Sequence, residues 1–326
     1  VQALIDCLSE LGIDWDGEVM RGGKLRKPSS KLDCKNSGTA LRFLIGQAAT
    51  CDFKIVLDGD STLRARSSLQ LPKSLGVEVN SKDENFEYPM EIKGPFNLDS
   101  VEIDVSKTSQ FHSSILLMAP RTNGFSIVTN GDAVSRKHSD LTWDLCKQTG
   151  AEIRGKPWNV SCPDVTIPPD ASMMAFAKLA NLDVKNAPSV SESIGHYLES
   201  SDLRDANDLI TPMAAWLALG EGGKITGAKH AAYKESNRIT RTADLLSQFS
   251  LKSTINPDGL TIPGNQNPKT PDGIVETYGD HRIQMTAILL ASISGGLVEG
   301  SELHRVAWPS YLDQLIDCGL EVIVHP

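Results

Sequence analysis

The stretch that decides the fold and the chemistry of this chain reads Tyr233-Lys234-Glu235-Ser236-Asn237-Arg238-Ile239-Thr240. The apolar residues that follow predict a helix that begins within the stretch and ends near Ser250. Lys234 and Arg238 would then lie four residues apart on its first turn, where they repel each other and oppose the positive end of the helix dipole. An anion bound between them would remove both penalties, and Glu235 would be able to exchange a proton beside it. The alternative for such a cation pair is a solvated helix start without a ligand.

The composition is that of a globular protein, with 40% hydrophobic and 22% charged residues in 326 positions. This length predicts about two domains. The net charge of −9 argues against a nucleic-acid-binding surface, so an anionic substrate requires a local basic pocket. The six cysteines include no Cys-x-x-Cys pair, which indicates reduced thiols and neither a disulfide framework nor a zinc site. The sequence contains no apolar run of membrane-spanning length and no visible signal peptide.

An apolar helix that closes on a glycine and runs into a strand recurs along the chain. The copies end at Gly12, Gly76, Gly150 and Gly319, with a weaker copy at Ser250. Glycine fits the left-handed position that follows a helix. Five copies therefore predict repeated strand–helix–strand units, with strands expected at 151–153 and 320–322 and a short sixth unit near 197–200.

The beginnings of several helices carry basic and hydroxyl side chains that capping does not explain. The clusters lie at 36–42, 64–66, 106–111, 135–138 and 280–282. Asp280 is a normal N-cap, but His281 and Arg282 after it are not explained in that way. If these helix starts converge, their amides, dipoles and cations point into one cleft, which would bind a ligand with more than one strong negative charge.

Five motifs occur in the order in which they are found in the EPSP synthase family of enolpyruvyl transferases, which the chain resembles. They are Asn36-Ser37-Gly38-Thr39-Ala40-Leu41-Arg42, Ser109-Gln110-Phe111, Ser135-Arg136, Lys234-Glu235-Ser236-Asn237-Arg238 and Asp280-His281-Arg282. The resemblance runs from Leu4 to about Tyr311. It implies an α/β (α+β) fold of two lobes, built from repeated βαβαββ units whose helix N-termini face an interlobe cleft.

The boundary between the two lobes is expected near Pro168, where the six predicted repeats divide in half. Residues 1–168 are expected to form a lobe that binds shikimate 3-phosphate, and residues 169–326 a second lobe with one shortened repeat. We expect the sequence to begin after the family's N-terminal Lys-Ser…Arg motif. It also departs from the family at Val306, where a lysine is usual, and at His230, where asparagine is frequent.

The activity that the resemblance implies is transfer of the enolpyruvyl group from phosphoenolpyruvate to the 5-hydroxyl of shikimate 3-phosphate, with release of phosphate. The expected partners are these two small molecules. No metal, organic cofactor, nucleic acid or membrane is implied, and a monomer in the cytoplasm is expected.

The site residues that the resemblance implies fall into three overlapping groups. The expected catalytic residues are Asp208, Glu235, Lys234 and His281. The expected ligands of shikimate 3-phosphate are Thr108, Ser109, Gln110, Ser135, Arg136, Asp208 and Lys234. The expected ligands of phosphoenolpyruvate are Asn36, Gly38, Thr39, Arg66, Gln110, Arg238 and Arg282. The resemblance implies that Asp208 takes the proton of the 5-hydroxyl, and either Glu235 or Lys234 is expected to protonate the enol methylene.

Two alternatives remain. A related transferase acts on UDP-N-acetylglucosamine, but the motifs at 108–111 and 234–238 follow the shikimate pattern, and no cysteine lies in the expected loop. The second alternative is an incomplete or decayed family member that binds anions without turnover.

Overall fold

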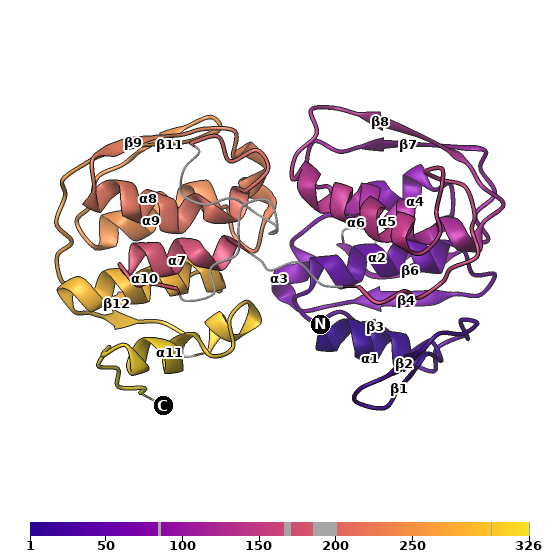
Figure 1. The fold of residues 1–326 in the computed structure, drawn as a ribbon, viewed down its shortest axis with the longest axis horizontal. Coiled ribbons are helices and arrows are strands. Elements are labelled where there is room, and N and C mark those ends of the chain that lie inside the picture. Colours follow the sequence, from indigo (N-terminus) through magenta and orange to yellow (C-terminus); the bar gives the residue numbers. More distant parts are fainter. Residues whose placement is uncertain (84–85, 166–170, 185–200, 301, 326) are drawn as a thin grey trace. The chain divides into compact units, whose positions relative to one another are not determined.

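The computed structural model describes residues 1–83, 86–165, 171–184, 201–300 and 302–325. The chain forms two compact units, Val1–Val165 (unit 1) and Thr166–Pro326 (unit 2). Each unit combines helices with sheets, so the predicted α/β class is confirmed (Figure 1). The boundary expected near Pro168 and the short repeat expected at 197–200 lie outside the described residues.

Unit 1 begins with a short helix and then alternates strands with helices. Its helices are α1 (Gln2–Glu10), α2 (Gly38–Ala49), α3 (Ser61–Arg64), α4 (Gln70–Ser74), α5 (Gln110–Met118) and α6 (Arg136–Gln148), with a 3-10 turn η1 (Ala119–Arg121). Its strands are β1 (Asp14–Trp15), β2 (Met20–Arg21), β3 (Leu32–Asp33), β4 (Ile55–Asp58), β5 (Glu78–Asp83), β6 (Phe86–Lys93), β7 (Ser100–Asp104) and β8 (Ser126–Asn130).

The stretch from β3 to β6 is one complete βαβαββ unit. β3 pairs in parallel with β4 across α2, and β6 pairs antiparallel with both β4 and β5, in the order β3-β4-β6-β5. The parallel pair β7–β8 repeats the first half of this pattern around α5. Figure 1 shows α2, α5 and α6 between these two sheets. Because α2 lies in the middle, most of its residues are buried, among them Leu41, Leu44 and Ile45.

Unit 2 is built from the same kinds of element. Its helices are α7 (Met174–Leu179), α8 (Ile210–Leu219), α9 (Arg238–Gln248), α10 (His281–Ser294) and α11 (Tyr311–Asp317), with 3-10 turns η2 (Ala171–Met173), η3 (Asn207–Leu209), η4 (Lys229–Tyr233) and η5 (Leu303–Val306). Its strands are β9 (Gly222–Ile225), β10 (Thr254–Asn256), β11 (Gly259–Pro263), β12 (Ile274–Val275) and β13 (Leu297–Val298).

The strand pairing of unit 2 repeats that of unit 1. β11 pairs antiparallel with β9 and β10, as β6 does with β4 and β5. A single parallel bridge between Asp202 and Thr226 occupies the place of the β3–β4 pair, and α8 connects these residues. β12 pairs in parallel with β13 around α10. Ligands of open α/β sheets bind at the carboxyl ends of parallel strands, where α2, α5 and α10 begin.

The repeated helix endings are confirmed and share one hydrogen-bond pattern. α1, α6, α9 and α11 are each followed by a residue with left-handed backbone, and the next residue donates its N–H to the carbonyl oxygen five residues earlier. Ala151 donates in this way to Cys146 (2.9 Å), and Leu320 to Leu315 (2.9 Å). The strands predicted at 151–153 and 320–322 are wrong, because neither stretch joins a sheet in the part of the chain that the structure describes.

The helix of the 233–240 stretch begins later than predicted. Asn237 caps α9, since its Oδ1 accepts the N–H of Thr240 at 3.3 Å, and Arg238 is the first helical residue. Lys234 lies before the helix in extended backbone. The predicted repulsion between Lys234 and Arg238 on one helical turn therefore does not occur.

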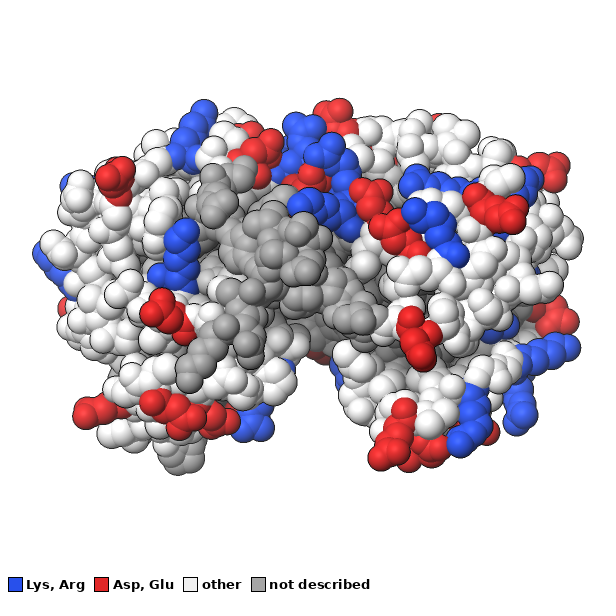
Figure 2. Space-filling model, in the orientation of Figure 1, with Lys and Arg blue, Asp and Glu red and all other residues white. Residues whose placement is uncertain are grey.

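Charged side chains of both signs are interspersed over the face shown in Figure 2. None of the described helices is long and apolar enough to cross a membrane.

The contact between α2 and α5 yields a stability prediction. A Cβ added at Gly46 would lie 2.9 Å from the Ser114 carbonyl oxygen and still closer to Ser114 Oγ. We expect Gly46→Ala to lower the free energy of unfolding by about 1–3 kcal/mol through overpacking, although alanine is the better helix former. Chemical denaturation measures this change. Gly22→Ala is the control, because Gly22 faces open space; equal stabilities of the two variants would contradict the packing of α2 on α5.

Candidate functional site

The residues predicted for phosphoenolpyruvate in unit 1 surround the start of α2. Asn36 to Thr39 connect β3 to this helix, and Ser37 Oγ caps it by accepting the N–H of Ala40 at 3.1 Å. A Cβ added at Gly38 would lie 3.3 Å from Arg42 Nη1 and 3.4 Å from Arg66 Nη1. Two guanidinium groups therefore lie beside the backbone of this loop, where a side chain larger than glycine would have to push them away by a few tenths of an ångström.

Hydrogen bonds hold both guanidinium groups in place. Arg66 Nη2 donates to the carbonyl oxygen (2.7 Å) and to Oδ1 (2.5 Å) of Asn36. Arg42 Nη1 donates to Gln110 Oε1 at 2.6 Å, and Gln110 Nε2 donates to Thr39 Oγ1 at 2.8 Å. The starts of α2 and α5 are thus linked through Gln110, and both arginines are largely buried.

The residues predicted for shikimate 3-phosphate in unit 1 lie at the starts of α5 and α6. Thr108 Oγ1 accepts the N–H of Gln110 at 3.2 Å, and Ser109 is buried. Ser135, the N-cap of α6, has a left-handed backbone (φ 50°), and Arg136 is the first residue of that helix. Non-glycine residues adopt this conformation mainly at turns and functional sites. Packing of α5 on α6, which includes a 2.8 Å bond between Thr142 and Ser113, brings the two groups together.

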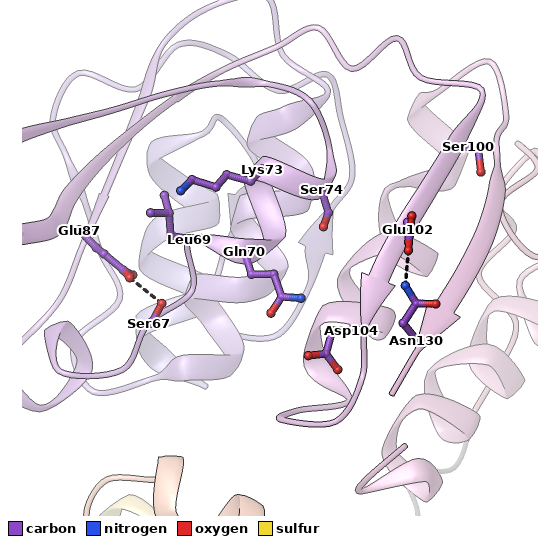
Figure 3. A pocket seen from close by; sticks show the side chains of 10 residues that line it. All are labelled: Ser67, Leu69, Gln70, Lys73, Ser74, Glu87, Ser100, Glu102, Asp104 and Asn130. Atoms are coloured by element: carbon purple, nitrogen blue, oxygen red, sulfur yellow. Dashed lines mark hydrogen bonds between the residues drawn. The ribbon is translucent and has the colours of Figure 1, made fainter. Parts of the chain in front are cut away.

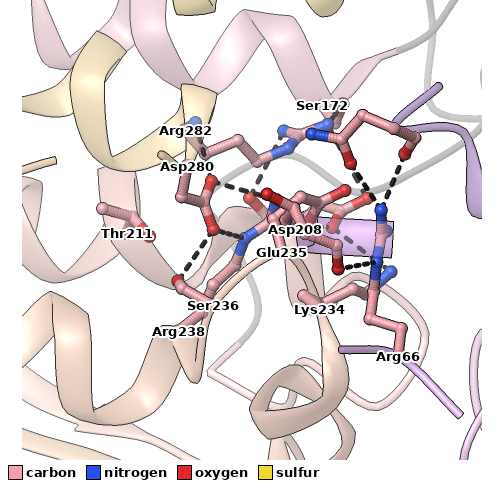
Figure 4. A network of polar contacts seen from close by, with 12 residues as sticks. Arg66, Ser172, Asp208, Thr211, Lys234, Glu235, Ser236, Arg238, Asp280 and Arg282 are labelled. Carbon is pink, nitrogen blue, oxygen red and sulfur yellow. Dashed lines mark hydrogen bonds and ion pairs between the residues drawn. The ribbon is translucent and has the colours of Figure 1, made fainter. Parts of the chain in front are cut away.

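Arg238 is the centre of the polar network in unit 2 (Figure 4). Its side chain is 1% exposed and donates to three carboxylates. Nε donates to Asp280 Oδ2 at 2.8 Å and Nη2 to Asp280 Oδ1 at 3.1 Å. Nη1 donates to Asp208 Oδ1 at 2.5 Å, and Nη2 donates to Glu235 Oε2 at 2.6 Å. The sequence indicated an uncompensated positive charge at Arg238. In the structure the carboxylates of Asp280, Asp208 and Glu235 compensate this charge.

The three carboxylates differ in how firmly they are held. Asp280 is fully buried, accepts the Ser236 hydroxyl at 2.9 Å and caps α10 by accepting the N–H of Arg282 at 3.0 Å. The side chains of Asp208 and Glu235 are 30% and 16% exposed. Asp280 therefore fixes Arg238, whereas Asp208 and Glu235 lie on the solvent side of it.

Two further cations approach Asp208. Lys234 Nζ lies 3.5 Å from its Oδ1, and Arg282 Nη2 lies 3.6 Å from its Oδ2. Arg282 Nη1 also donates to the Asp208 carbonyl oxygen at 3.3 Å. The structure thus brings together five residues predicted for the site in unit 2, Asp208, Lys234, Glu235, Arg238 and Arg282.

Two buried histidines border this network. Burial, and then the charges of Arg238 and Arg282, lower the pKa of His281 to about 4. Burial, and then the charge of Lys234, lower the pKa of His230 to about 4. Neither ring nitrogen of His230 has a hydrogen-bond partner among the described residues. Both imidazoles are therefore neutral at neutral pH.

Sequence reasoning missed the roles of Asp280 and Arg42. It assigned Asp280 only the role of a helix N-cap, although the carboxylate also accepts two hydrogen bonds from Arg238. It noted Arg42 as a basic residue at a helix start without assigning it to the site. Both roles depend on contacts across the fold, since Asp280 lies 42 positions from Arg238 and Gln110 lies 68 from Arg42.

A separate pocket in unit 1 does not fit a polyanion. Its volume is about 780 Å³, and none of the predicted site residues lines it (Figure 3). It is lined by the carboxylates of Glu87, Glu102 and Asp104 and by one lysine, Lys73. Among the described residues, no group of three or more His, Cys, Asp or Glu side chains is arranged to hold a metal ion.

The buried histidines yield a pH prediction. Between about pH 6.5 and 4 an unfolded chain binds protons at these positions and the folded chain does not, so stability falls as the pH falls through this window. A shift of this size corresponds to up to about 3 kcal/mol for each residue. We expect His230→Asn to reduce the loss of unfolding free energy between about pH 7 and 4.5.

His325→Asn is the control for this experiment, because His325 is exposed. Urea titrations at the two pH values measure the difference. An equal acid loss in wild type, His230→Asn and His325→Asn would show that His230 is not neutral and buried in the folded protein.

Comparisons with known proteins identify the family of this chain. The family model for EPSP synthase (3-phosphoshikimate 1-carboxyvinyltransferase) matches residues 1–182 and 159–315. A curated 3-phosphoshikimate 1-carboxyvinyltransferase from Methanothermobacter thermautotrophicus is 29% identical over 343 residues, covering 91% of this chain and 81% of the relative. Another, from Methanococcoides burtonii, is 28% identical over 380 residues, covering 99% of this chain and 88% of the relative.

Solved structures share the fold. EPSP synthase from Acinetobacter baumannii superposes with a TM-score of 0.74 at 20% identity, covering 100% of this chain and 88% of that one. The enolpyruvyl transferase NikO from Streptomyces tendae gives a TM-score of 0.64 at 13% identity, covering 98% of this chain and 86% of that one. The predicted enolpyruvyl transferase fold is therefore confirmed, and the family match over most of the chain establishes that this protein belongs to the EPSP synthase family.

Proposed function

We propose that this chain transfers the enolpyruvyl group of phosphoenolpyruvate to the 5-hydroxyl of shikimate 3-phosphate and releases phosphate. Family membership and the names of its curated relatives support this activity. The observation that carries the proposal is the unit 2 network, in which Asp208 and Glu235, two predicted catalytic carboxylates, hydrogen-bond Arg238, a predicted phosphoenolpyruvate ligand. The reaction consists of an addition, an elimination and proton transfers, with no net oxidation. The proposal therefore includes no cofactor.

We assign the substrates to the helix starts. Shikimate 3-phosphate is bound by Thr108, Ser109, Gln110, Ser135 and Arg136, with Asp208 and Lys234 at its reacting hydroxyl. Phosphoenolpyruvate is bound by Asn36, Gly38, Thr39, Arg66, Gln110, Arg238 and Arg282. The grouping of guanidinium and hydroxyl groups at these N-termini supports the assignment, because amides and cations together favour phosphate and carboxylate groups.

Asp208 is the base of the first step. Its oxygens lie near Lys234, Arg238 and Arg282, and these cations favour its charged form, which a base requires. As Asp208 takes the hydroxyl proton, the 5-oxygen bonds to C2 of phosphoenolpyruvate and the methylene carbon takes a proton from Glu235 or Lys234. The tetrahedral intermediate then loses phosphate from C2, and the leaving phosphate takes the proton that Asp208 holds. The group that protonated the methylene carbon takes a proton back from the methyl group, which restores the double bond.

The arginines contribute electrostatically. Arg238 and Arg282 are positioned by hydrogen bonds before any ligand arrives, so they need little rearrangement to stabilise charge on the leaving phosphate. Neutral His281 lines the reacting centre without adding a cation. We also propose that the protein acts as a monomer in the cytoplasm. Its scattered cysteines, without a Cys-x-x-Cys pair, support the reducing compartment.

The activity is tested by incubating the chain with both substrates. We expect inorganic phosphate and the enolpyruvyl product in equal amounts. Asp208→Asn should lower kcat by about a hundredfold or more, because it removes the base while keeping the size of the side chain. Binding of both substrates without product in the wild type would instead favour the alternative of a family member without turnover.

Gly38 allows a test of the phosphoenolpyruvate assignment. The backbone of Gly38 is compatible with alanine, but the added methyl would contact Arg42 and Arg66 at 3.3–3.4 Å. We expect Gly38→Ala to raise the KM for phosphoenolpyruvate about tenfold with little change for shikimate 3-phosphate. Gly273→Ala is the control, since Gly273 faces open space. An unchanged KM for phosphoenolpyruvate in Gly38→Ala would show that this loop does not line the phosphoenolpyruvate site.

Arg136 tests the shikimate 3-phosphate assignment. The residue is exposed at the start of α6, so its removal should leave the core intact. Loss of a charge-assisted hydrogen bond of about 1.5–3 kcal/mol predicts that Arg136→Ala raises the KM for shikimate 3-phosphate roughly tenfold or more. Lys147→Ala, at the opposite end of the same helix, is the matched control. A rise in the KM for phosphoenolpyruvate alone would contradict the assignment.

A further inference from the structure

Two arginines near the start of α9 contact the segment that leads into α10. Arg238 Nε donates to Asp280 Oδ2 at 2.8 Å, and its Nη2 donates to Asp280 Oδ1 at 3.1 Å. Arg241, three residues later, lies over the ring of Tyr278, with its guanidinium carbon 4.1 Å from the ring centroid. The two arginines therefore hold two residues that lie two positions apart, just before the helix.

The backbone at Tyr278 is unusual for a tyrosine. The N–H of Asp280 donates to the carbonyl oxygen of Thr277 at 3.0 Å, which closes a tight turn over 277–280. Both central residues of this turn have positive φ, 55° at Tyr278 and 66° at Gly279. Glycine, asparagine and aspartate dominate such positions, and a bulky side chain there is strained. The turn itself does not explain the tyrosine, whereas the contact with Arg241 does.

The side chains of α9 hold the segment before α10 at every second residue. Gln248, the last residue of α9, accepts the N–H of Glu276 through its Oε1 at 2.8 Å. Gln248, Arg241 and Arg238 thus contact positions 276, 278 and 280 in turn. Of these three contacts, the one in the middle holds the strained residue.

Asp280 connects this segment to the guanidinium groups of the proposed phosphoenolpyruvate site. Its carboxylate orients Arg238 and also caps α10 by accepting the N–H of Arg282 at 3.0 Å. A shift of the turn would therefore displace both arginines at once. Misplacement of binding groups by about 1 Å is enough to lower the efficiency of an enzyme strongly.

We propose that Tyr278 and Arg241 are positioning residues for the phosphoenolpyruvate site. Their stacked pair fixes the turn over 277–280, and the turn sets the place of Asp280 and of the two guanidinium groups that depend on it. The inference rests on the proposed function for the identity of the ligand. It goes beyond that function because neither residue of the stacked pair is assigned to a substrate.

The chemistry of the stacked pair fits this role. Burial, and then the charge of Asp244, raise the pKa of Tyr278, so the phenol is neutral at neutral pH. The cation of Arg241 therefore faces the π surface of a neutral ring, a contact that phenylalanine retains. Arg241 Nη1 also bonds Asp244 at 2.9 Å. That exposed ion pair within α9 does not reach α10, so it offers no route to the site.

Substitution of Tyr278 tests the proposal. Tyr278→Asn keeps a residue that tolerates the left-handed backbone and removes the ring. We expect the KM for phosphoenolpyruvate to rise about three- to tenfold, with less than about a twofold change for shikimate 3-phosphate. Tyr278→Phe should restore the wild-type KM, and urea unfolding checks that each variant is folded under the assay conditions. Equal KM values for phosphoenolpyruvate in wild type and Tyr278→Asn would overturn the proposal, as would equal impairment in Tyr278→Asn and Tyr278→Phe.

Arg241→Met removes the same contact from the other side. We expect the same rise in KM, and the double variant with Tyr278→Asn should be no worse than either single variant, because both changes remove one interaction. Lys178→Met is the matched control, since Lys178 lies over the ring of Trp216 in the same unit, 5.1 Å from its centroid. Effects that multiply in the double variant, or an equal rise in Lys178→Met, would contradict the proposal.

A measurement that needs no turnover separates this inference from the proposed function. Hydrogen exchange of the buried Arg238 Nε–H is followed by NMR of nitrogen-15-labelled protein, and Arg238→Lys identifies the signal. We expect faster exchange in Tyr278→Asn than in wild type and Tyr278→Phe, because Asp280 is held less firmly. Equal exchange in all three proteins would overturn the positioning role. Failure of the proposed function has a different signature, in which the wild type forms no product while the difference in exchange persists.

Discussion

Arg238 is almost completely buried, and the arrangement of unit 2 around it follows from the need to compensate its charge. Burial alone would lower the pKa of the guanidinium group, but the charges of Asp280, Glu235 and Asp208 raise it well above its ordinary range. A buried cation is stable only when hydrogen bonds and opposite charges replace its lost hydration. The helix start of α9, the cap of α10 and the 3-10 turn η3 meet at this one side chain.

The repeated topology explains how such a centre is assembled. Each parallel strand pair is connected by a helix that begins at the carboxyl end of the first strand, so motifs distant in sequence are brought to neighbouring helix starts. Unit 1 places two arginines and Gln110 at the start of α2 by the same rule. Left-handed residues at Lys35, Ser135 and Tyr278 turn the chain just before three of these helices.

The repeats, the caps and most helices could be predicted from the sequence because they depend on local patterns. Gly12, Gly150 and Gly319 are left-handed helix ends, and Asp280 is the predicted cap of α10. The strands predicted at 151–153 and 320–322 failed, because a glycine after a helix fixes the helix end and not the pairing of the chain beyond it.

The contacts of the site depend on the tertiary fold and were harder to predict. The sequence indicated that Lys234 and Arg238 lack compensation on one helical turn. In the structure Lys234 precedes the helix, and carboxylates that lie 30 and 42 positions from Arg238 in sequence compensate its charge. Local charge pairing alone contains no information on such partners. Motif order nevertheless put into one list the residues of unit 2 that the structure brings together around Arg238, because each motif lies at or beside a helix start.

The central claim is that Arg238 and Arg282 bind phosphoenolpyruvate at the unit 2 network. A crystal structure with phosphoenolpyruvate and 5-deoxyshikimate 3-phosphate bound, an analogue that lacks the reacting hydroxyl, tests it most directly. The account predicts that Asp280 stays on Nε of Arg238 while ligand oxygens lie within hydrogen-bond distance of Arg238 and Arg282. Phosphoenolpyruvate bound in full without a contact to either guanidinium group would contradict it.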